Sequence, residues 1–290
     1  MRVANYFLCL CAVVYFGIPA VIVEQAETSE AVAGQIDPGD SDPGTSDPNS
    51  AMVKDGTDDE RAAPDIDRQR EQELAKQFES LDDSVEMLWL GEGDEKFAAL
   101  FSAADSSEKK GALLILHDVG AHPDWPDLVQ PLRRDMPSAG WAVLVPQLPL
   151  PSSGSPRTDY QHRLEPTAAR IALALADLNA RGYRKVVIVG HGFGASVGVN
   201  VATGDAAGQF AGFIAVGSEN EKLPDRLPFL DVYGSRDYPN VIRAADKRAR
   251  SARRSAELGY QRVEMEGADH RFTAMEKSLV KRIRGWLERT

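Results

Sequence analysis

The sequence predicts an α/β protein in which a mostly parallel central sheet is covered by helices on both faces. Short apolar runs alternate with helical patterns over most of its 290 residues, and this alternation is typical of such a sheet. Several runs are apolar throughout, as strands buried on both sides require. Hydrophobic residues make up 43% of the chain, which is enough to build one sizeable core.

The first predicted elements are a helix and an edge pair of strands. Residues 65–80 are rich in Glu, Gln and Arg and are typical of a short charged helix. Residues 85–90 and 96–103 are apolar runs joined by a short connection, which predicts an antiparallel pair at the sheet edge. Residues 112–117, Ala-Leu-Leu-Ile-Leu-His, predict a strand buried on both faces.

The middle of the chain continues with two helices and two strands. Residues 126–139 suit a helix with a proline near its start, where the missing N–H costs little. Residues 141–146 predict the next strand. An alanine-rich helix with regularly placed leucines is expected over 163–180, and the following glycine ends it. Residues 185–189 predict another buried strand.

The last part of the chain repeats the same alternation after a glycine-rich turn. The expected elements are a helix from about 195 to 202, strands over 210–216 and 228–233, a long basic helix over 241–258, a strand over 260–266 and a closing helix over 272–287. The segment between residues 216 and 228 is too short to form a large lid domain.

Two further segments precede the predicted domain. Residues 1–26 contain an uncharged apolar run from Val3 to Val23, which predicts an export signal peptide or, if it is retained, an N-terminal anchor in the inner membrane. Residues 27–67 are rich in Asp, Pro and Gly and contain no aromatic residue, which predicts a disordered acidic linker. The folded domain is expected over 68–290, and the expected location is the periplasm.

Charge and cysteine usage exclude two classes of protein. The formal net charge is −11, and residues 24–67 contain 13 acidic residues against only Lys54 and Arg61. The rest of the chain is therefore nearly neutral and lacks the basic surface that nucleic-acid binding needs. The only cysteines are Cys9 and Cys11, so no disulfide is expected to stabilise the domain.

Three features lie in a fixed order at the ends of predicted strands. The run 190–194, Gly-His-Gly-Phe-Gly, joins a strand to a helix as the nucleophile elbow G-x-S-x-G does. Asp237 follows a later strand in a Gly-x-x-Asp pattern, and His270 lies in the loop after the last strand. Elbow, acid and histidine come in the chain order of the α/β-hydrolase triad. The sequence therefore predicts an α/β-hydrolase fold.

Glycine occupies the position of the catalytic nucleophile in this elbow. Gly192 has no side chain, so it cannot attack a carbonyl carbon, and His270 has no hydroxyl there to activate. Residues 194–198 also match G-x-S-x-G. Their serine, Ser196, is expected about one turn inside the helix, where a bond to the backbone suits it better than nucleophilic attack.

Several short motifs resemble a known family. They are His122-Pro123-Asp124-Trp125-Pro126, Leu132-Arg133-Arg134, Gly140-Trp141, the elbow run 190–195, Leu230-Asp231-Val232-Tyr233-Gly234 and Tyr260-Gln261-Arg262. Together they are similar to a bacterial envelope family of α/β-hydrolase-like proteins, classed as a domain of unknown function of type 3530. The resemblance covers roughly residues 70–290. It implies the same fold, export from the cytoplasm and a glycine at the elbow, and it implies no particular substrate.

Backbone groups near the elbow predict an oxyanion-like notch. The amides near Asp118 and Val119, with the amide of Phe193, lie where hydrolases of this fold place their oxyanion donors. The two histidines and two aspartates within 117–124 also invite a metal site, but their spacing matches no familiar ligand pattern. No metal and no cofactor are predicted.

Asp237 and His270 have two interpretations. If the side chains meet, Asp237 orients the imidazole, which then acts as a base on water. Alternatively, the two residues form a buried hydrogen-bonded pair that joins two loops. Asp231 is a weaker acid candidate because it lies inside a predicted strand.

A basic stripe lies on the long helix near the C-terminus. Arg243, Lys247, Arg250 and Arg254 recur at helical spacing and therefore share one face. A solvated surface is the plain interpretation. Binding of an anionic envelope polymer, or of the acidic linker of the same chain, is the alternative.

These observations lead to two function hypotheses. The first is an exported hydrolase-like protein without serine catalysis, which serves as a binding or accessory protein for an unidentified ligand or partner in the cell envelope. The second is a true hydrolase, either an esterase that uses Ser196 or an enzyme that activates water with His270 and Asp237. The sequence leaves open whether the protein is an enzyme.

Overall fold

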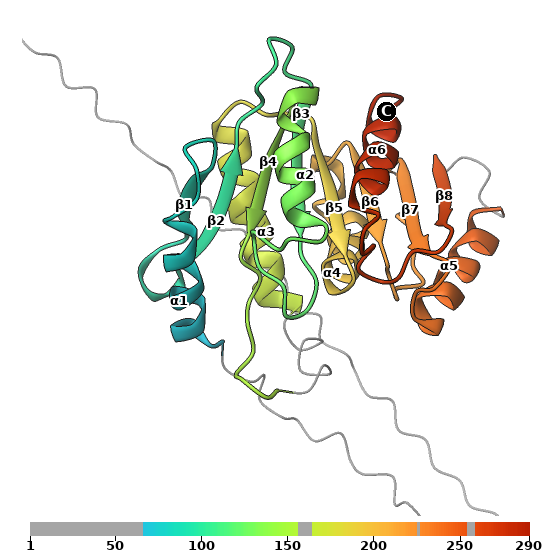
Figure 1. Cartoon of the computed structure of the whole chain (residues 1–290), viewed down its shortest axis with the longest axis horizontal. Helices are drawn as coiled ribbons and strands as arrows, with labels where there is room; N and C mark the ends of the chain where they lie inside the picture. The colour runs from blue at the N-terminus through green and yellow to red at the C-terminus, as the bar shows by residue number, and fades with distance from the viewer. Residues whose placement is uncertain (1–65, 156–163, 225–226, 254–258) are drawn as a thin grey trace, which may run out of the picture. The chain divides into compact units, whose positions relative to one another are not determined.

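The structure, a computed structural model, describes residues 66–155, 164–224, 227–253 and 259–290 (Figure 1). The predicted leader and all but the last two residues of the predicted linker lie outside the described residues. In the part of the chain that the structure describes, no helix is long and apolar enough to cross a membrane.

One sheet of eight strands forms the centre of the described part of the chain. Its spatial order is β1-β2-β4-β3-β5-β6-β7-β8, where β2 is antiparallel to β1 and to β4 and the other neighbours are parallel. The strands are β1 Glu86–Leu90, β2 Phe97–Ser102, β3 Gly111–Leu116, β4 Trp141–Pro146, β5 Val186–His191, β6 Gly212–Val216, β7 Phe229–Gly234 and β8 Tyr260–Met265. The edge pair and the mostly parallel sheet with helices on both faces are as predicted.

Helices cover both faces of this sheet. They are α1 Arg68–Phe78, α2 Val129–Asp135, α3 Leu164–Ala180, α4 Phe193–Thr203, α5 Pro239–Ala252 and α6 Glu276–Leu287. Figure 1 shows α2 and α6 in front of the sheet and α3 and α4 behind it. Side chains alternate along each strand, so Leu113 of β3 packs in the α2 and α6 layer while Leu114 packs in the α3 and α4 layer.

Helix α1 is joined to the domain by a buried ion pair. Asp67, the last residue of the predicted linker, caps the helix by accepting a hydrogen bond from the N–H of Arg70. Glu71 is 6% exposed and accepts two hydrogen bonds of 2.9 Å from Arg170 of α3. It also accepts the N–H of Leu150 at 3.0 Å. The remaining lone pairs of the buried carboxylate are thereby satisfied.

Two helices begin later than the sequence predicts. Helix α2 begins at Val129 rather than 126, and α6 begins at Glu276 rather than 272. The second difference has a backbone cause, because Phe272 and Ala274 have φ angles of 58° and 60°. A left-handed residue cannot continue a right-handed helix. Burial of the Phe272 ring, which is 0% exposed, offsets the cost of this conformation and fixes the loop that carries His270.

The turn between β5 and α4 is tighter than predicted. Strand β5 extends through His191 and α4 begins at Phe193, so the turn has a single apex residue. Two flanking glycines permit it. A Cβ on Gly190 would lie 2.5 Å from the Cα of Ala195, and a Cβ on Gly194 would lie 2.1 Å from the carbonyl oxygen of Leu116. Both distances are far below van der Waals contact, so α4 packs closely against β5 and β3 only without these side chains.

We expect Gly194→Ala to lower the free energy of unfolding by about 3 kcal/mol, because the added methyl group meets fixed backbone atoms. Gly208→Ala is the matched control, since a Cβ there has no heavy atom within 4 Å. Urea unfolding followed by circular dichroism measures both. Equal stability of the two variants would contradict the close packing of α4 on β3.

Candidate functional site

The carboxyl ends of four parallel strands meet above the centre of the sheet. Asp118 follows β3, Gly192 follows β5, Asp237 follows β7 and His270 follows β8. In open α/β sheets, this edge is where binding and catalytic groups converge. The four residues lie far apart in the sequence, and the strand order places them together.

Asp237 and His270 form a buried hydrogen-bonded pair. The Nδ1 atom of His270 lies 2.7 Å from Oδ1 of Asp237, and each residue is 6% exposed. The same oxygen accepts the N–H of Tyr238 at 2.7 Å, which fixes the direction of the carboxylate. The structure therefore brings the predicted acid and histidine together in the relation of a hydrolase triad.

Gly192 forms the apex of the elbow. Its φ and ψ angles of 51° and −110° are costly for residues with a side chain, and nucleophile elbows hold their serine in a strained turn of this kind. Its N–H donates to the carbonyl of Val216 at 3.0 Å, which ties the apex to β6. The backbone of the elbow is intact even though the reactive side chain is absent.

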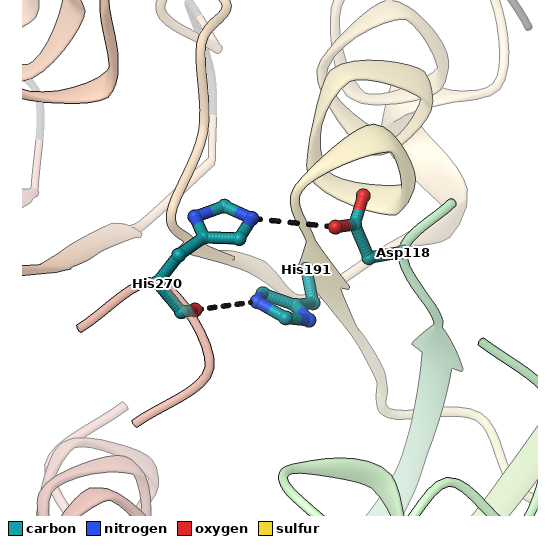
Figure 2. Close-up of side chains that lie close together, drawn as sticks. All are labelled: Asp118, His191 and His270. Carbon is teal, nitrogen blue, oxygen red and sulfur yellow. Dashed lines mark hydrogen bonds and ion pairs between the residues drawn. The ribbon is translucent and has the colours of Figure 1, made fainter. Parts of the chain in front are cut away.

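The carboxylate of Asp118 fills the place of the missing nucleophile. A Cβ built on Gly192 would lie only 2.2 Å from Oδ1 of Asp118. That oxygen accepts the N–H of Phe193 at 2.7 Å, and Oδ2 lies 3.3 Å from Nε2 of His270 (Figure 2). Asp118 thus occupies the nucleophile position and binds the donor expected to stabilise an oxyanion.

This arrangement differs from the notch predicted from the sequence. The prediction gave backbone roles to Asp118, Val119 and Phe193, and the Phe193 amide is a donor as expected. Its acceptor, however, is the side chain of Asp118, while Val119 is a half-buried residue of the same loop. Sequence reasoning missed this because 75 residues separate Asp118 from Phe193 and no local pattern reports a contact at that separation.

A neutral histidine holds Asp118 in position. His117 is 2% exposed, and burial lowers its pKa to about 4. Its Nε2 atom accepts the N–H of Leu148 at 3.0 Å, so the ring hydrogen is on Nδ1. From there it donates to the carbonyl oxygen of Asp118 at 2.9 Å. This bond fixes the backbone from which the carboxylate projects.

The charges at the site favour an ion cluster. Burial alone lowers the pKa of His270, but the hydrogen bonds to Asp118 and Asp237 outweigh it and raise the pKa to about 9. Burial alone raises the pKa of Asp118, and the hydrogen bond from His270 together with that from Phe193 brings it well below its usual range. At neutral pH, His270 is therefore a cation between two carboxylates.

A second histidine supports the first. The Nε2 atom of His191 lies 2.9 Å from the carbonyl oxygen of His270, and the two rings stack with their centres 4.9 Å apart. Figure 2 shows the His191 ring turned to this carbonyl rather than toward Asp118. Burial lowers the pKa of His191, so this ring is neutral beside the cationic one.

Asp118, His191 and His270 place possible metal-ligating atoms within 4.8 Å of one another. These side chains already bind one another or the backbone, so a cation would have to displace the contact between His270 and Asp118. The histidines and aspartates within 117–124, considered above as metal ligands, have separate partners in the structure. His117 binds backbone groups, and Asp124 forms an ion pair with Arg133 of α2.

Ser196 lies in the first turn of α4. Its hydroxyl is 3.4 Å from the carbonyl oxygen of Gly192, four residues back along the helix, which is the usual backbone partner of a serine inside a helix. The structure shows no contact between this hydroxyl and His270 among the described residues.

Asp231 does not belong to the site. It is 0% exposed and is paired through two hydrogen bonds, of 2.7 and 2.9 Å, with Arg248 of α5. Arg248 is equally buried, which the sequence does not indicate because the basic residues near it on α5 form the exposed stripe. Of that stripe, Lys247 pairs with Glu221, and Arg254 lies outside the described residues.

The fold and the site together define an α/β-hydrolase-fold protein whose elbow carries no nucleophile. Residues 5–165 and 151–289 match the family described as "Protein of unknown function (DUF3530)". The chain belongs to this family, as its motifs predicted. No curated protein matches the chain in sequence.

Several solved structures share the fold. A serine hydrolase without a lid from Xanthomonas campestris has 15% sequence identity and a TM-score of 0.54, and the match covers 72% of this chain and 96% of that chain. The dienelactone hydrolase of Anabaena variabilis has 16% identity and a TM-score of 0.55, with coverage of 71% and 98%. An esterase of Pyrococcus furiosus has 13% identity and a TM-score of 0.56, with coverage of 71% and 92%. At these identities the likeness shows the fold alone.

We expect the wild-type His270 to remain protonated until the pH approaches about 9. A raised pKa stabilises the fold fully below 6.5, the ordinary value, and this stabilisation is lost as the pH rises through the folded value. Asp118→Asn removes one charge, so the pKa of His270 falls toward 6.5. NMR titration of the histidine ring signals measures this, with Asp135→Asn on α2 as the control. An unchanged His270 titration in Asp118→Asn would contradict the ion cluster.

Proposed function

We propose that this protein is a non-catalytic binding or accessory protein of the cell envelope, built on an α/β-hydrolase fold. The observation that carries the proposal is the position of Asp118, whose carboxylate occupies the space next to Gly192 where a nucleophile would stand. The same carboxylate accepts the Phe193 amide. The proposal therefore rests on an occupied site as well as on the glycine.

Acyl transfer by the triad mechanism needs a nucleophile, a neutral base and free oxyanion donors. Gly192 supplies no nucleophile. His270 is a cation at neutral pH because its pKa is about 9, so it cannot accept a proton from serine or water. The Phe193 amide is bound to Asp118 at 2.7 Å. All three requirements fail at the same place.

The comparisons agree with a retained scaffold and altered chemistry. The similar structures from Xanthomonas campestris, Anabaena variabilis and Pyrococcus furiosus are described as a serine hydrolase, a dienelactone hydrolase and an esterase. This chain shares their fold and keeps the paired histidine and acid, Asp237 and His270. A binding role uses the same end of the sheet and its surrounding loops without catalytic turnover.

The rival function is hydrolysis by Ser196 or by water activated at His270. The bond of Ser196 to the Gly192 carbonyl argues against the first route. The second requires His270 to lose its proton and Asp118 to leave Nε2, from which it lies 3.3 Å away. Both changes act against the ion cluster, and we therefore favour the binding role.

The N-terminal sequence supports the proposed location. An uncharged run from Val3 to Val23 and a linker, residues 27–67, with 12 acidic residues precede the predicted domain. We propose that residues 1–26 direct export to the periplasm and that, if this leader is retained as an anchor, residues 27–67 join the domain to the inner membrane. Mass spectrometry of the mature N-terminus, with cell fractionation, tests this. A cytoplasmic protein with an uncut leader would contradict it.

We expect the purified wild-type protein to turn over no activated ester and to take no label from a fluorophosphonate probe, because in the described part of the chain His270 is bonded to two carboxylates and to no serine or cysteine side chain. Ser196→Ala and His270→Ala should leave the background rate unchanged. Spectrophotometric ester assays and labelling gels measure this. Turnover by the wild type that either substitution abolishes would overturn the proposal.

We expect Gly192→Ser alone to remain inactive, because its Cβ collides with the Asp118 carboxylate. The double variant Gly192→Ser with Asp118→Ala removes the obstruction, frees the Phe193 amide and lets His270 act as a base. It should hydrolyse an activated ester at least ~100-fold faster than the single variant. A folded but inactive double variant would contradict the idea that Asp118 is what blocks an otherwise assembled site.

A further inference from the structure

The space beside Gly192 that the Asp118 carboxylate fills, called the hollow from here on, is bordered by two donors that bind this one planar group. The N–H of Phe193 donates to Oδ1 of Asp118 at 2.7 Å, and Nε2 of His270 faces Oδ2 at 3.3 Å. Each oxygen of the carboxylate thus has its own partner on a different element. Two donors placed in this way select a group with two neighbouring acceptor oxygens.

The electrostatics of the hollow also favour an anion. Gly192, the N-cap of the 11-residue helix α4, makes no side-chain cap, and the carboxylate of Asp118, in the loop after β3, accepts the first N–H of the helix instead. The positive end of a helix stabilises such a charge. His270 adds a buried cation at the same point: its side chain is 7% exposed, its Nδ1 is bonded to Asp237 and its Nε2 faces Asp118. Without an anion there, a buried cation would keep only Asp237 as a counter-charge.

The two carboxylates that flank His270 differ in access. The side chain of Asp237 is 0% exposed and that of Asp118 is 12% exposed. Asp118 begins a loop that includes Gly120, an exposed residue with φ of 74°. Tyr238, which is 48% exposed, places its ring 4.6 Å from that of His270 at the same edge of the sheet. Of the two carboxylates, Asp118 is therefore the one that solvent reaches.

We propose that this hollow is a carboxylate-binding site whose resident ligand is Asp118, and that a carboxylate-bearing ligand binds in exchange for the Asp118 side chain. This proposal rests on the non-catalytic function above and names the ligand class of the same site. Asp118 acts as a built-in competitor. The ligand binds only to the minor state in which the Asp118 side chain has left the site, so its apparent affinity is reduced in proportion to the population of that state. Removing the Asp118 carboxylate makes this state the major one and raises the apparent affinity for the ligand.

The test uses the full chain with Asp118→Ala and sodium acetate as the probe. Ionic strength is held constant with sodium chloride, and EDTA is present throughout so that no metal ion bridges acetate to the histidines. NMR signals of the His270 ring report binding. We expect Asp118→Ala to bind acetate saturably, with an apparent affinity at least ~10-fold above that of the wild type.

Three further variants make the result specific. Asp118→Asn keeps a side chain of the same shape in the hollow and should gain no affinity for acetate. Asp118→Ala with His270→Gln lacks the cation and should lose the gain; in this variant the NMR signal of the Phe193 backbone amide, the second donor at the site, reports binding. Asp118→Ser provides a second open site should the alanine variant fold poorly. A folded Asp118→Ala or Asp118→Ser that shows no saturable response, or a wild type that binds acetate as tightly, would overturn the proposal.

Paired probes test the carboxylate itself. Glucuronate is compared with glucose, and N-acetylalanine with its amide, so that a sugar acid and a peptide terminus are examined separately. At least one acid should bind to Asp118→Ala, and both neutral partners should fail. Neutral compounds that bind as well as the acids would overturn the ligand class. Ester turnover by the wild type would instead overturn the non-catalytic function and leave the acetate result standing.

Discussion

The cationic imidazole of His270 lies between the carboxylates of Asp118 and Asp237, and this ion cluster determines what the hollow at the elbow can do. Each partner comes from a different strand end, so the cluster depends on the strand order of the whole sheet. It also fixes the protonation state of the histidine, since two nearby negative charges outweigh the effect of burial. A base in a hydrolase must be neutral to accept a proton, and this one is not.

The strands, the elbow and the meeting of Asp237 with His270 could be predicted because each depends on a local pattern at a strand end. Buried strands appear as apolar runs, and a glycine-rich turn after such a run marks the elbow. The role of Asp118 could not be predicted in this way. Its carboxylate acts through contacts with Phe193 and His270, which are 75 and 152 residues away, and only the register of the folded sheet brings these groups together.

Two other features were hidden for related physical reasons. The late start of α6 follows from left-handed backbone at Phe272 and Ala274, and that backbone is stabilised by burial of the Phe272 ring, which the sequence pattern does not report. Arg248, which the predicted basic stripe did not include, is fully buried against Asp231. Charged residues at helical spacing indicate a solvent-exposed face on average. A single arginine that points into the core can be recognised only once the acidic partner that neutralises it is known.

Gly192 and Asp118 are best understood as a coupled pair. A side chain at position 192 would occupy the same space as the Asp118 carboxylate, so the two positions cannot both be filled. With a glycine alone, the Phe193 amide and the His270 cation would face an empty hollow, and unpaired buried donors are costly. Asp118 satisfies both donors at once. The glycine at the elbow therefore provides the space that an internal carboxylate needs, in addition to removing a nucleophile.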